Sequence, residues 1–547
     1  MLMGKWVGGC AFLFSTLGFG LAATPAQALE APKFLTHRYP FLFGPFQKLE
    51  SGQPWAKAQQ AQLLIEQQPE VRALLQAEPG RQLALIQGAE YEGVQTYKFQ
   101  DFVQGIEVLG SQALHHEGPA GTQVAHSMEP VQITLMPSFT SGEMGVLAQN
   151  LGGNRPLEAE PELKILPGKE GQAARLVYFA RLGAAKGKPA VDLLIHAHSG
   201  QIIAELDRIR DVHGPADATQ KPASRGSARS GNKAVPPSDP ASKKPAQAKL
   251  KIAPIDVLGA NDECQQVGFG GMPEKLLLRT CDKLIVNGKL QKKADIAAKQ
   301  ALLNSQKTLE YYLSKHKRDS FNGKGAKLIS VVHAGEGMNN AFWDPENHFM
   351  AYGDGDGETF RSFTQATDVA GHEMTHGIAS DTAKFTGMGE SGALDEAYAD
   401  FFGKLISGED SWALGKTLYI DPKAPGIRNL KNPNAILTRF KDEKTGKPKP
   451  YPAKASEMIT FQEPCNRSND GCGVHVNSTV ISHAGYQMVQ RLGQAKAEKL
   501  NYLVLTQYLS SGADFKKARN ATVEACAQLY STADCEQVKD AWAAVGL

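Results

Sequence analysis

The stretch DVAGHEMTHGIAS, Asp368 to Ser380, places two histidines four residues apart, with a glutamate directly after the first. Residues four apart lie on one face of an α-helix, so His372 and His376 can direct their imidazole nitrogens at one ion. Neutral imidazole suits Zn²⁺, which it binds at about 2.0–2.1 Å. Glu373 points to the side, where it could take a proton from metal-bound water. On these five residues alone, an amphipathic helix with ordinary histidines stays open as the alternative.

A second helical stretch, GESGALDEAYADFFG, follows from Gly389 to Gly403. Glu396 can supply a third ligand, which leaves a fourth position for water, as catalytic zinc sites require. Asp400 lies four residues further along the same face and could accept a hydrogen bond from the free N–H of a ligand histidine. Taken singly, either acid could be a solvated helix charge, but the spacing favours a catalytic zinc site.

Four blocks of this sequence resemble the thermolysin-like zinc metallopeptidases, in order and in spacing. They are NNAFWD (Asn339 to Asp344, with MAYGDGDG soon after), DVAGHEMTHG, ESGALDEAYADFFG and NDGCGVHVNS (Asn469 to Ser478). The resemblance covers Lys251 to Leu547 and implies a secreted endopeptidase of α+β fold. It implies a two-lobed catalytic module with a β-rich N-terminal lobe (252–380), a mainly α-helical C-terminal lobe (381–547) and an active-site helix between them.

The resemblance also assigns roles to single residues. It implies zinc ligands at His372, His376 and Glu396, catalytic roles for Glu373, His475 and Asp470, an orienting role for Asp400, substrate-backbone contacts at Asn340, Ala341 and Arg428, and a pocket lined by Val369, Leu414, Leu418 and Ile427. Glu373 would be the general base and would then carry the proton to the leaving amine. His475, held by Asp470, would donate to the oxyanion, and Arg428 would grip a substrate carbonyl. The aliphatic pocket implies a preference for bulky apolar residues on the amine side of the cut bond.

Two departures from the family pattern concern an oxyanion donor and calcium. Family members carry a tyrosine eleven residues after the second histidine, where this chain has Gly387. The family's paired-calcium site uses several carboxylates, of which only Asp368 remains. The matching positions are Ser407, Ser411, Ala413 and Lys416. Because a lysine there would repel Ca²⁺, we expect this calcium site to be absent; other calcium sites stay open.

The first half of the chain reads as a leader, a module and a linker. Residues 1–28 combine one lysine, an apolar run and small residues ending in Ala26-Gln27-Ala28, which predicts a cleaved secretory signal and no membrane anchor. Residues 29–213 contain a helix or helix pair (Pro54 to Gln76) and then alternating runs that predict antiparallel strands. This module resembles the family's propeptide, with a fungalysin/thermolysin-type segment followed by a PepSY-like one. Residues 214–251 are rich in Pro, Ser, Ala and Lys and predict an exposed, cleavable linker.

The cysteines fit an exported chain. Six remain after the leader, namely Cys264, Cys281, Cys465, Cys472, Cys526 and Cys535, and an even number favours disulfides over buried thiols. Nearest-neighbour pairing would close three short loops, although sequence does not fix connectivity. A Cys465–Cys472 bridge would brace the loop beside Asp470 and His475.

These observations predict a zinc endopeptidase that is made as a zymogen and acts on proteins or peptides. The propeptide would be both its folding aid and its inhibitor. A net charge of +2 gives no reason to expect a nucleic-acid partner, and we expect a monomer. Two alternatives are a catalytically silent zinc-binding protein and a zinc hydrolase of non-peptide amides. A silent zinc-binding protein does not need the base Glu373. A hydrolase of non-peptide amides does not need residues that are suited to binding an extended peptide backbone.

Overall fold

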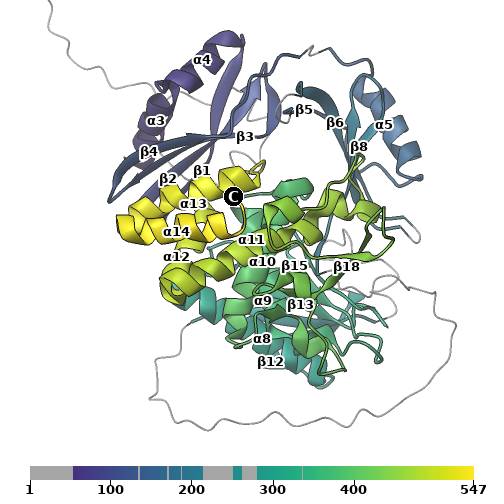
Figure 1. Cartoon of the computed structure of the whole chain (residues 1–547). Helices are drawn as coiled ribbons and strands as arrows, with labels where there is room; N and C mark the ends of the chain where they lie inside the picture. The colour runs from purple at the N-terminus through teal and green to yellow at the C-terminus, as the bar shows by residue number, and fades with distance from the viewer. Residues whose placement is uncertain are drawn as a thin grey trace, which may run out of the picture. The chain divides into compact units, whose positions relative to one another are not determined.

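Figure 1 shows the computed structural model, which describes residues 53–133, 136–168, 172–185, 188–212, 251–261, 280–335 and 337–547. The predicted leader, the predicted linker up to residue 250 and Cys264 lie outside the described residues. Residues Ala58–Leu547 form one unit, to which the contacts below belong; the other unit, Met1–Lys57, is described only from residue 53. Within the described ranges, no helix has the length and apolar character needed to span a membrane.

The helix pair predicted in the first module is confirmed as α3 (Gln53–Glu66) and α4 (Pro69–Ala77). The alternating runs form one sheet of order β1-β2-β3-β5-β6-β7-β8, with β4 paired to β3. Its strands are β1 (Arg81–Tyr91), β2 (Val94–Val103), β3 (Ile106–Gly118), β4 (Gly121–His126), β5 (Glu162–Leu166), β6 (Arg175–Leu182), β7 (Val191–His196) and β8 (Ile202–Asp207). The pairings are antiparallel as expected, except that β3 and β5 are parallel, with α5 (Ser141–Leu151) on the intervening chain.

Strand β2 is buried on both faces, although its sequence alternates between apolar and polar residues. Its apolar side chains pack under α3 and α4. On the polar face, the Lys98 ammonium donates to the carbonyl oxygens of Leu509, at 2.8 Å, and Thr382, at 3.2 Å. Burial lowers the pKa of Lys98 to about 7. The polar face is therefore a contact surface with the C-terminal lobe and not a solvated one.

The N-terminal lobe of the second module contains a sheet of order β12-β11-β10-β13-β15-β14-β9. Its strands are β9 (Arg210–Asp211), β10 (Ile255–Gly259), β11 (Asp282–Val286), β12 (Lys289–Leu290), β13 (Leu328–Val332), β14 (Ala341–Asp344) and β15 (Phe349–Tyr352). The predicted helix after Asp295 is α8 (Ile296–His316), and the Asp295 side chain accepts a hydrogen bond from its first turn. Strand β9 comes from the end of the first module, so the two modules share this sheet.

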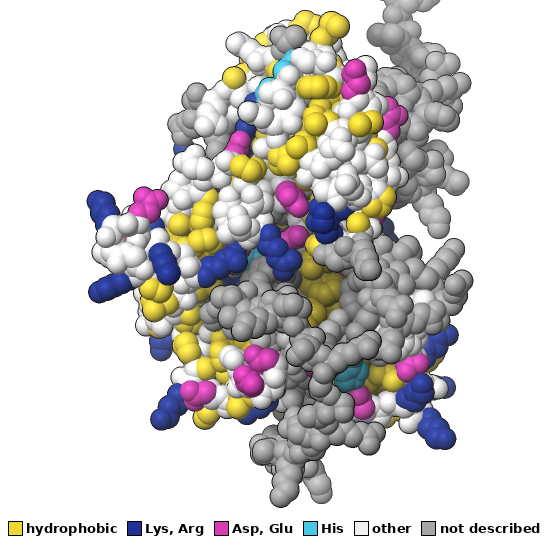
Figure 2. All heavy atoms as spheres, turned by 90° about the vertical axis from the view of Figure 1, so that its right-hand side faces the viewer, with side chains coloured by type: hydrophobic (Ala, Val, Ile, Leu, Met, Phe, Trp, Pro, Cys, Tyr) yellow, Lys and Arg dark blue, Asp and Glu magenta, His cyan; other side chains and the backbone are white. Residues whose placement is uncertain are grey.

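The remaining chain is mainly helical, as predicted. Its helices are α9 (Thr367–Asp381), α10 (Gly389–Ser407), α11 (Asp470–Leu492), α12 (Gln494–Leu503), α13 (Phe515–Leu529) and α14 (Thr532–Ala544), with a π-helical turn at Val504–Tyr508. Its short strands are β16 (Ala413–Leu414), β17 (Arg428–Asn429), β18 (Leu437–Lys441) and β19 (Pro448–Pro450), and its short 3₁₀ turns are Phe363–Gln365, Lys416–Leu418, Pro433–Ala435, Ala455–Glu457 and Arg467–Asn469. Charged side chains of both signs are interspersed on the face shown in Figure 2.

Disulfides join neighbouring cysteines, as predicted for two of the three pairs. Cys465 is bonded to Cys472, and Cys526 is bonded to Cys535, which ties α13 to α14. Cys281 is also disulfide-bonded, and its predicted partner Cys264 lies outside the described residues.

Helices α9 and α10 approach each other closely because both carry glycine at their contact. A Cβ atom built on Gly403 of α10 would lie 2.4 Å from the Asp368 carbonyl oxygen and 3.1 Å from the His372 backbone nitrogen. A Cβ atom on Gly371 of α9 would lie 3.2 Å from the Gly403 Cα atom. Since these helices carry His372 and Glu396, their spacing sets the distance between the predicted zinc ligands.

Replacing Gly403 by alanine should therefore separate α9 from α10. We expect Gly403→Ala to cost about 1–3 kcal/mol of stability, the range for overpacking a filled interior, and to weaken zinc binding. The melting temperature and the zinc content after dialysis would measure both effects. Gly142→Ala is the control, because a Cβ atom there meets nothing within 4 Å; equal behaviour of the two variants would contradict the packing argument.

A buried ammonium adds a second link between the two helices. Lys404 Nζ lies 3.0 Å from Asp368 Oδ2, 3.0 Å from Glu409 Oε2 and 3.1 Å from the Ala413 carbonyl oxygen. Burial would lower the pKa of Lys404, but Asp368 and Glu409 raise it, so the group stays charged. Lys416, which stands at a position matching a calcium ligand of the family, is exposed. The cation that contacts Asp368 is instead Lys404, which did not stand out in the sequence.

The Lys404 ammonium should make the stability of α9 and α10 independent of calcium. We expect calcium chelation at constant zinc to lower the melting temperature of the protein less than it does in calcium-rich relatives. Lys404→Met should cost about 3 kcal/mol or more, since it leaves Asp368 buried without a counter-charge, and added calcium should restore part of the loss. Lys416→Met is the matched control and should change nothing. A large calcium-dependent rise in the melting temperature of the unaltered protein would refute this expectation.

Candidate metal centre and cleft

The two histidines of α9 lie one turn apart and face the same point. The distance between His372 Nε2 and His376 Nε2 is 3.0 Å, and both side chains are fully buried. Residues 368 to 379 of α9 are buried throughout, so the helix crosses the interior and brings its polar groups with it. Buried imidazoles need polar partners, and each has a carboxylate oxygen within 3.5 Å of both ring nitrogens.

Glu396 on α10 supplies a third candidate ligand. Its carboxylate oxygens lie 3.5 Å from His372 Nε2 and 3.3 Å from His376 Nε2. Ligands at about 2.05 Å from a tetrahedral ion are about 3.3 Å apart, so these spacings fit zinc. Among the described residues, these three form the group of His, Cys, Asp and Glu side chains that could hold a metal ion. The predicted ligand set is thus brought together by two helices.

Each histidine has a carboxylate at its other ring nitrogen. Asp400 Oδ1 lies 3.0 Å from His372 Nδ1, as the sequence predicted. Asp395 Oδ1 lies 2.9 Å from His376 Nδ1. Asp395 did not stand out in the sequence, because it directly precedes Glu396 in the acidic stretch DEAYAD. Carboxylates at Nδ1 favour the tautomer that presents the Nε2 lone pair to a metal.

Arg428 counterbalances the acids of the site. The side chain is fully buried, its Nε and Nη2 atoms donate to Asp400 at 2.8 and 2.6 Å, and Nη2 lies 3.3 Å from Glu396 Oε2. Its Nη1 atom has no hydrogen-bond partner among the residues that the structure describes. Arg428 therefore fixes Asp400 and retains one donor, which is what the predicted contact with a substrate carbonyl would need.

The charges of the site compensate one another. Burial would raise the pKa of Glu396, but His475 and His376 hold it well below the usual range. Burial likewise opposes ionisation of Asp400, and Arg428 and His372 lower its pKa instead. Burial lowers the pKa of His372, which favours the neutral form that binds metals. Glu373 lies between the two histidines on α9 with its side chain fully buried.

His475 is held at the site by Asp470 and by the disulfide loop. Its Nδ1 atom lies 2.5 Å from Asp470 Oδ1, and its Nε2 atom lies 3.5 Å from Glu396 Oε1. Asp470 Oδ2 also accepts the backbone N–H groups of His475 and Val476, both at 2.9 Å. A left-handed turn at residues 471–473 makes this approach possible.

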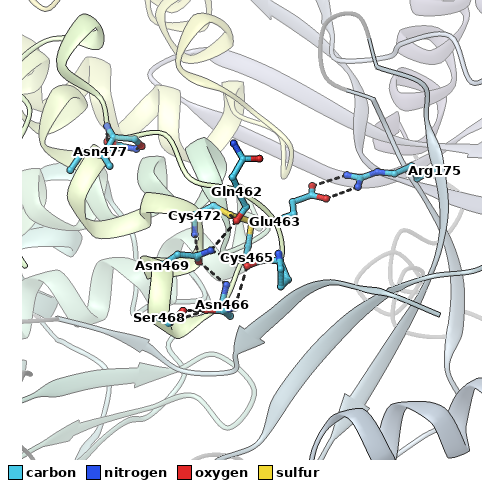
Figure 3. Close-up of a disulfide and its surroundings, with 11 residues drawn as sticks. Arg175, Gln462, Glu463, Cys465, Asn466, Ser468, Asn469, Cys472 and Asn477 are labelled. Carbon is cyan, nitrogen blue, oxygen red and sulfur yellow. Dashed lines mark hydrogen bonds and ion pairs between the residues drawn. A yellow bond between two sulfur atoms is a disulfide. The ribbon is translucent and has the colours of Figure 1, made fainter. Parts of the chain in front are cut away.

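The Cys465–Cys472 loop encloses Asp470 and also contacts the first module (Figure 3). The Glu205 backbone N–H donates to the Cys465 carbonyl, at 2.8 Å, and the Cys465 N–H donates to the Ile203 carbonyl, at 3.0 Å. Beside the loop, the Arg175 guanidinium binds both carboxylate oxygens of Glu463, at 2.6 and 2.9 Å. The loop that holds Asp470 is thus also a docking point for strand β8.

Two of the predicted substrate-binding residues, Asn340 and Ala341, lie at the start of strand β14. Asn340 precedes β14, and its side chain accepts the Ala341 N–H at 3.0 Å. The four predicted pocket residues, Val369, Leu414, Leu418 and Ile427, are all fully buried and belong to one apolar cluster. That these four buried side chains form a substrate pocket stays a prediction.

The end of the first module pairs with strand β14. Strand β9 is antiparallel to β14, with Asp211 opposite Phe342 and Arg210 opposite Trp343. The Val212 N–H donates to the Ala341 carbonyl at 3.1 Å. Val212 is fully buried in the apolar cluster that contains the four pocket residues.

Comparison with known families matches the second module in two parts. The family described as "Thermolysin metallopeptidase, catalytic domain" matches residues 280–380, and "Thermolysin metallopeptidase, alpha-helical domain" matches residues 383–547. The first range includes α9 with both histidines, and the second includes α10 and α11. Both helices that carry the candidate ligands therefore fall within matched ranges.

One relative extends the similarity into the first module, and two others match about half of this chain. A bacillolysin of Bacillus subtilis subsp. amylosacchariticus is 27% identical over 493 residues, which covers 87% of each chain. The neutral protease NprE of Bacillus pumilus is 36% identical over 251 residues, which covers 46% of this chain and 77% of NprE. The solved precursor of protealysin, a metalloproteinase from Serratia proteamaculans, is 27% identical, with a TM-score of 0.46. The match covers 55% of this chain and 90% of the protealysin precursor chain.

Proposed function

This chain belongs to the thermolysin metallopeptidase family and is a metalloendopeptidase, and we propose that it is exported as a zinc-dependent zymogen that its own first module inhibits. The observation that carries the proposal is the Arg210–Val212 segment, which lies along β14 as an extended peptide. A peptide paired with the edge of a sheet has its backbone fixed by hydrogen bonds and its alternate side chains directed into pockets. The segment thus binds as a substrate would.

In this proposal His372, His376 and Glu396 hold one zinc ion. When bound, zinc supplies Lewis-acid chemistry, polarising a peptide carbonyl and lowering the pKa of water. Glu373 takes a proton from the attacking water and delivers it to the leaving amine.

His475 and Arg428 handle the substrate's oxygens. His475 Nε2–H donates to the carbonyl oxygen as that atom gains negative charge, and the Asp470 carboxylate at Nδ1 keeps the imidazole oriented. A donor of this kind lowers the activation free energy by about 2.7–4 kcal/mol. Arg428 Nη1, which has no partner, donates to the next carbonyl along the peptide.

Specificity for aliphatic residues on the amine side of the cut bond is supported by Val212. This side chain is fully buried and belongs to the same large apolar cluster as Val369, Leu414, Leu418 and Ile427, and burial of a valine contributes roughly 1.5–3 kcal/mol. If Val212 occupies the pocket of the residue after the cut, the Asp211–Val212 bond is the one presented to the metal site in the precursor. Inhibition and specificity would then use one pocket.

A folding role for the first module is supported by its contacts with the C-terminal lobe. Lys98 binds backbone carbonyls at the end of α9 and beyond α12, and His116 stacks on Tyr508 with ring centroids 3.7 Å apart. A catalytic module that pairs many distant residues folds slowly. A preformed sheet that binds these segments lowers the entropy cost of bringing them together.

The two alternative functions are less well supported. A silent zinc-binding protein does not account for Glu373 beside the metal cluster, and the metallopeptidase relatives disfavour it. A hydrolase of small non-peptide amides has no use for a cleft that pairs with an extended backbone. Casein hydrolysis by the mature protein, measured with and without a chelator, would separate the three functions.

Glu373→Gln should leave zinc bound and abolish peptidase activity. The physical reason is that this residue moves the proton and does not complete the ligand set, so removing the carboxylate removes the base alone. Zinc content by elemental analysis and peptide turnover would test it, with His376→Gln as the control that should lose both. Near-normal turnover by a zinc-loaded Glu373→Gln enzyme would refute the proposed role of Glu373 as the general base.

Val212→Asp should release the inhibition of the precursor. A carboxylate in an aliphatic pocket has no partner and costs several kcal/mol, so the segment should leave the cleft. We expect purified Val212→Asp precursor to cleave a fluorogenic peptide without a lag, at a rate at least about tenfold above the initial rate of the unaltered precursor, a difference of about 1.4 kcal/mol in inhibitor binding. Val146→Asp is the control, because Val146 is exposed on α5. If both precursors showed the same lag, the segment would not be the inhibitor.

A further inference from the structure

The register of the Arg210–Val212 segment places a cationic side chain on the acyl side of the cleft. Side chains two apart on a strand share a face, so Arg210 points to the same side of the segment as Val212. With Val212 in the pocket after the cut bond, Arg210 stands two residues before that bond. This assignment rests on the proposed function.

The Arg210 guanidinium faces a carboxylate of the metal centre. Arg210 Nε lies 3.3 Å from Asp395 Oδ2, and the Asp395 side chain is only 4% exposed. The other oxygen of this carboxylate, Oδ1, is bound to His376 Nδ1 at 2.9 Å. Asp395 therefore orients a predicted zinc ligand with one oxygen and binds a cation in the cleft with the other.

The guanidinium occupies space that exists because residue 387 is glycine. A Cβ atom built on Gly387 would lie 2.6 Å from Arg210 Nη2 and 2.9 Å from Arg210 Cζ. The three atoms nearest to this Cβ position all belong to the Arg210 guanidinium. A tyrosine at this position, as the family pattern has, would fill the space that Arg210 uses. The departure at Gly387 thus opens a hollow beside Asp395.

The hollow stays acidic when the first module is removed. Its enzyme-side lining includes Asp395, Glu396 and Asp470, against one cation, Arg467; the two other acids, Glu205 and Asp207, leave with the propeptide. Glu396 is a predicted metal ligand and Asp470 is bound to His475, so Asp395 Oδ2 is the oxygen that an incoming cation would meet.

We propose that Asp395 and Gly387 form a subsite for an arginine side chain two residues before the cut bond. Preferred substrates are then peptides of the form Arg-X followed by an aliphatic residue, with cleavage before the aliphatic residue. Arginine fits better than lysine because its planar fork can reach the carboxylate while lying against Gly387. Arg210 in the propeptide occupies this subsite in the precursor.

The test is a set of fluorogenic peptides that differ only at the position two residues before a fixed X–Leu bond, carrying Arg, Lys, Gln or Glu there. For the mature enzyme we expect kcat/KM to fall in the order Arg, Lys, Gln, Glu, with about a tenfold ratio between Arg and Gln, which is about 1.4 kcal/mol. Equal cleavage of the Arg and Gln peptides would overturn the inference and leave the proposed function standing. Cleavage of none of them would contradict the proposed function itself.

Two variants separate the subsite from the metal centre. Asp395→Asn keeps an oxygen for the His376 N–H but removes the charge, so the ratio of kcat/KM between the Arg and Gln peptides should fall towards one, whatever the overall rate of the variant. Gly387→Asn, which tolerates the positive φ of 75° at this position, should fill the hollow and lower the same ratio without touching His376. An unchanged ratio in both variants would overturn the inference, and a ratio lowered by Gly387→Asn would support it even if Asp395→Asn failed to fold.

Discussion

The close contact between α9 and α10 is the constraint on which the rest of the structure depends. Glycine at Gly371 and Gly403 lets the two backbones approach, and the Lys404 ammonium holds Asp368 of α9 to α10. Only at that separation do Glu396 and the two histidines of α9 come within ligand distance of one point. The contact uses an internal cation, so the chain itself neutralises acids that would otherwise need a metal ion.

Because this centre is buried, each of its charged groups needs a partner of opposite charge or a hydrogen bond. Asp400 binds both His372 and Arg428, and Asp395 binds His376, so each histidine keeps one nitrogen for the metal. Charged groups in an interior of low polarity are tolerated only when paired and hydrogen-bonded. The same pairing sets function, because it leaves Arg428 Nη1 and Asp395 Oδ2 as the groups available to a peptide.

The first module meets the catalytic module in two chemically different ways. Its polar β2 face lies on the C-terminal lobe through Lys98 and its neighbours, whereas its last strand, β9, completes the catalytic sheet at β14. The first contact buries surface far from the metal, and the second occupies the cleft. In the proposed zymogen, a single cut after the module would weaken the second contact, because it removes the covalent link that keeps the segment at high effective concentration. Folding assistance and inhibition would then end with one event.

The sequence alone determined what depends on local spacing. The four-residue interval puts His372 and His376 on one helix face, and the interval between Glu396 and Asp400 does the same on the next helix, since the helical repeat is fixed by backbone geometry. Helix α8, the hairpins of the first module and two disulfide pairs were likewise readable from neighbours in the chain. The tertiary structure decided the rest: that Lys404 and not Lys416 meets Asp368, that Asp395 holds His376, that the polar face of β2 is buried, and that Arg210 fills the space beside Gly387. These contacts join residues far apart in the chain, and their partners are chosen by how helices and sheets pack, which no local period encodes.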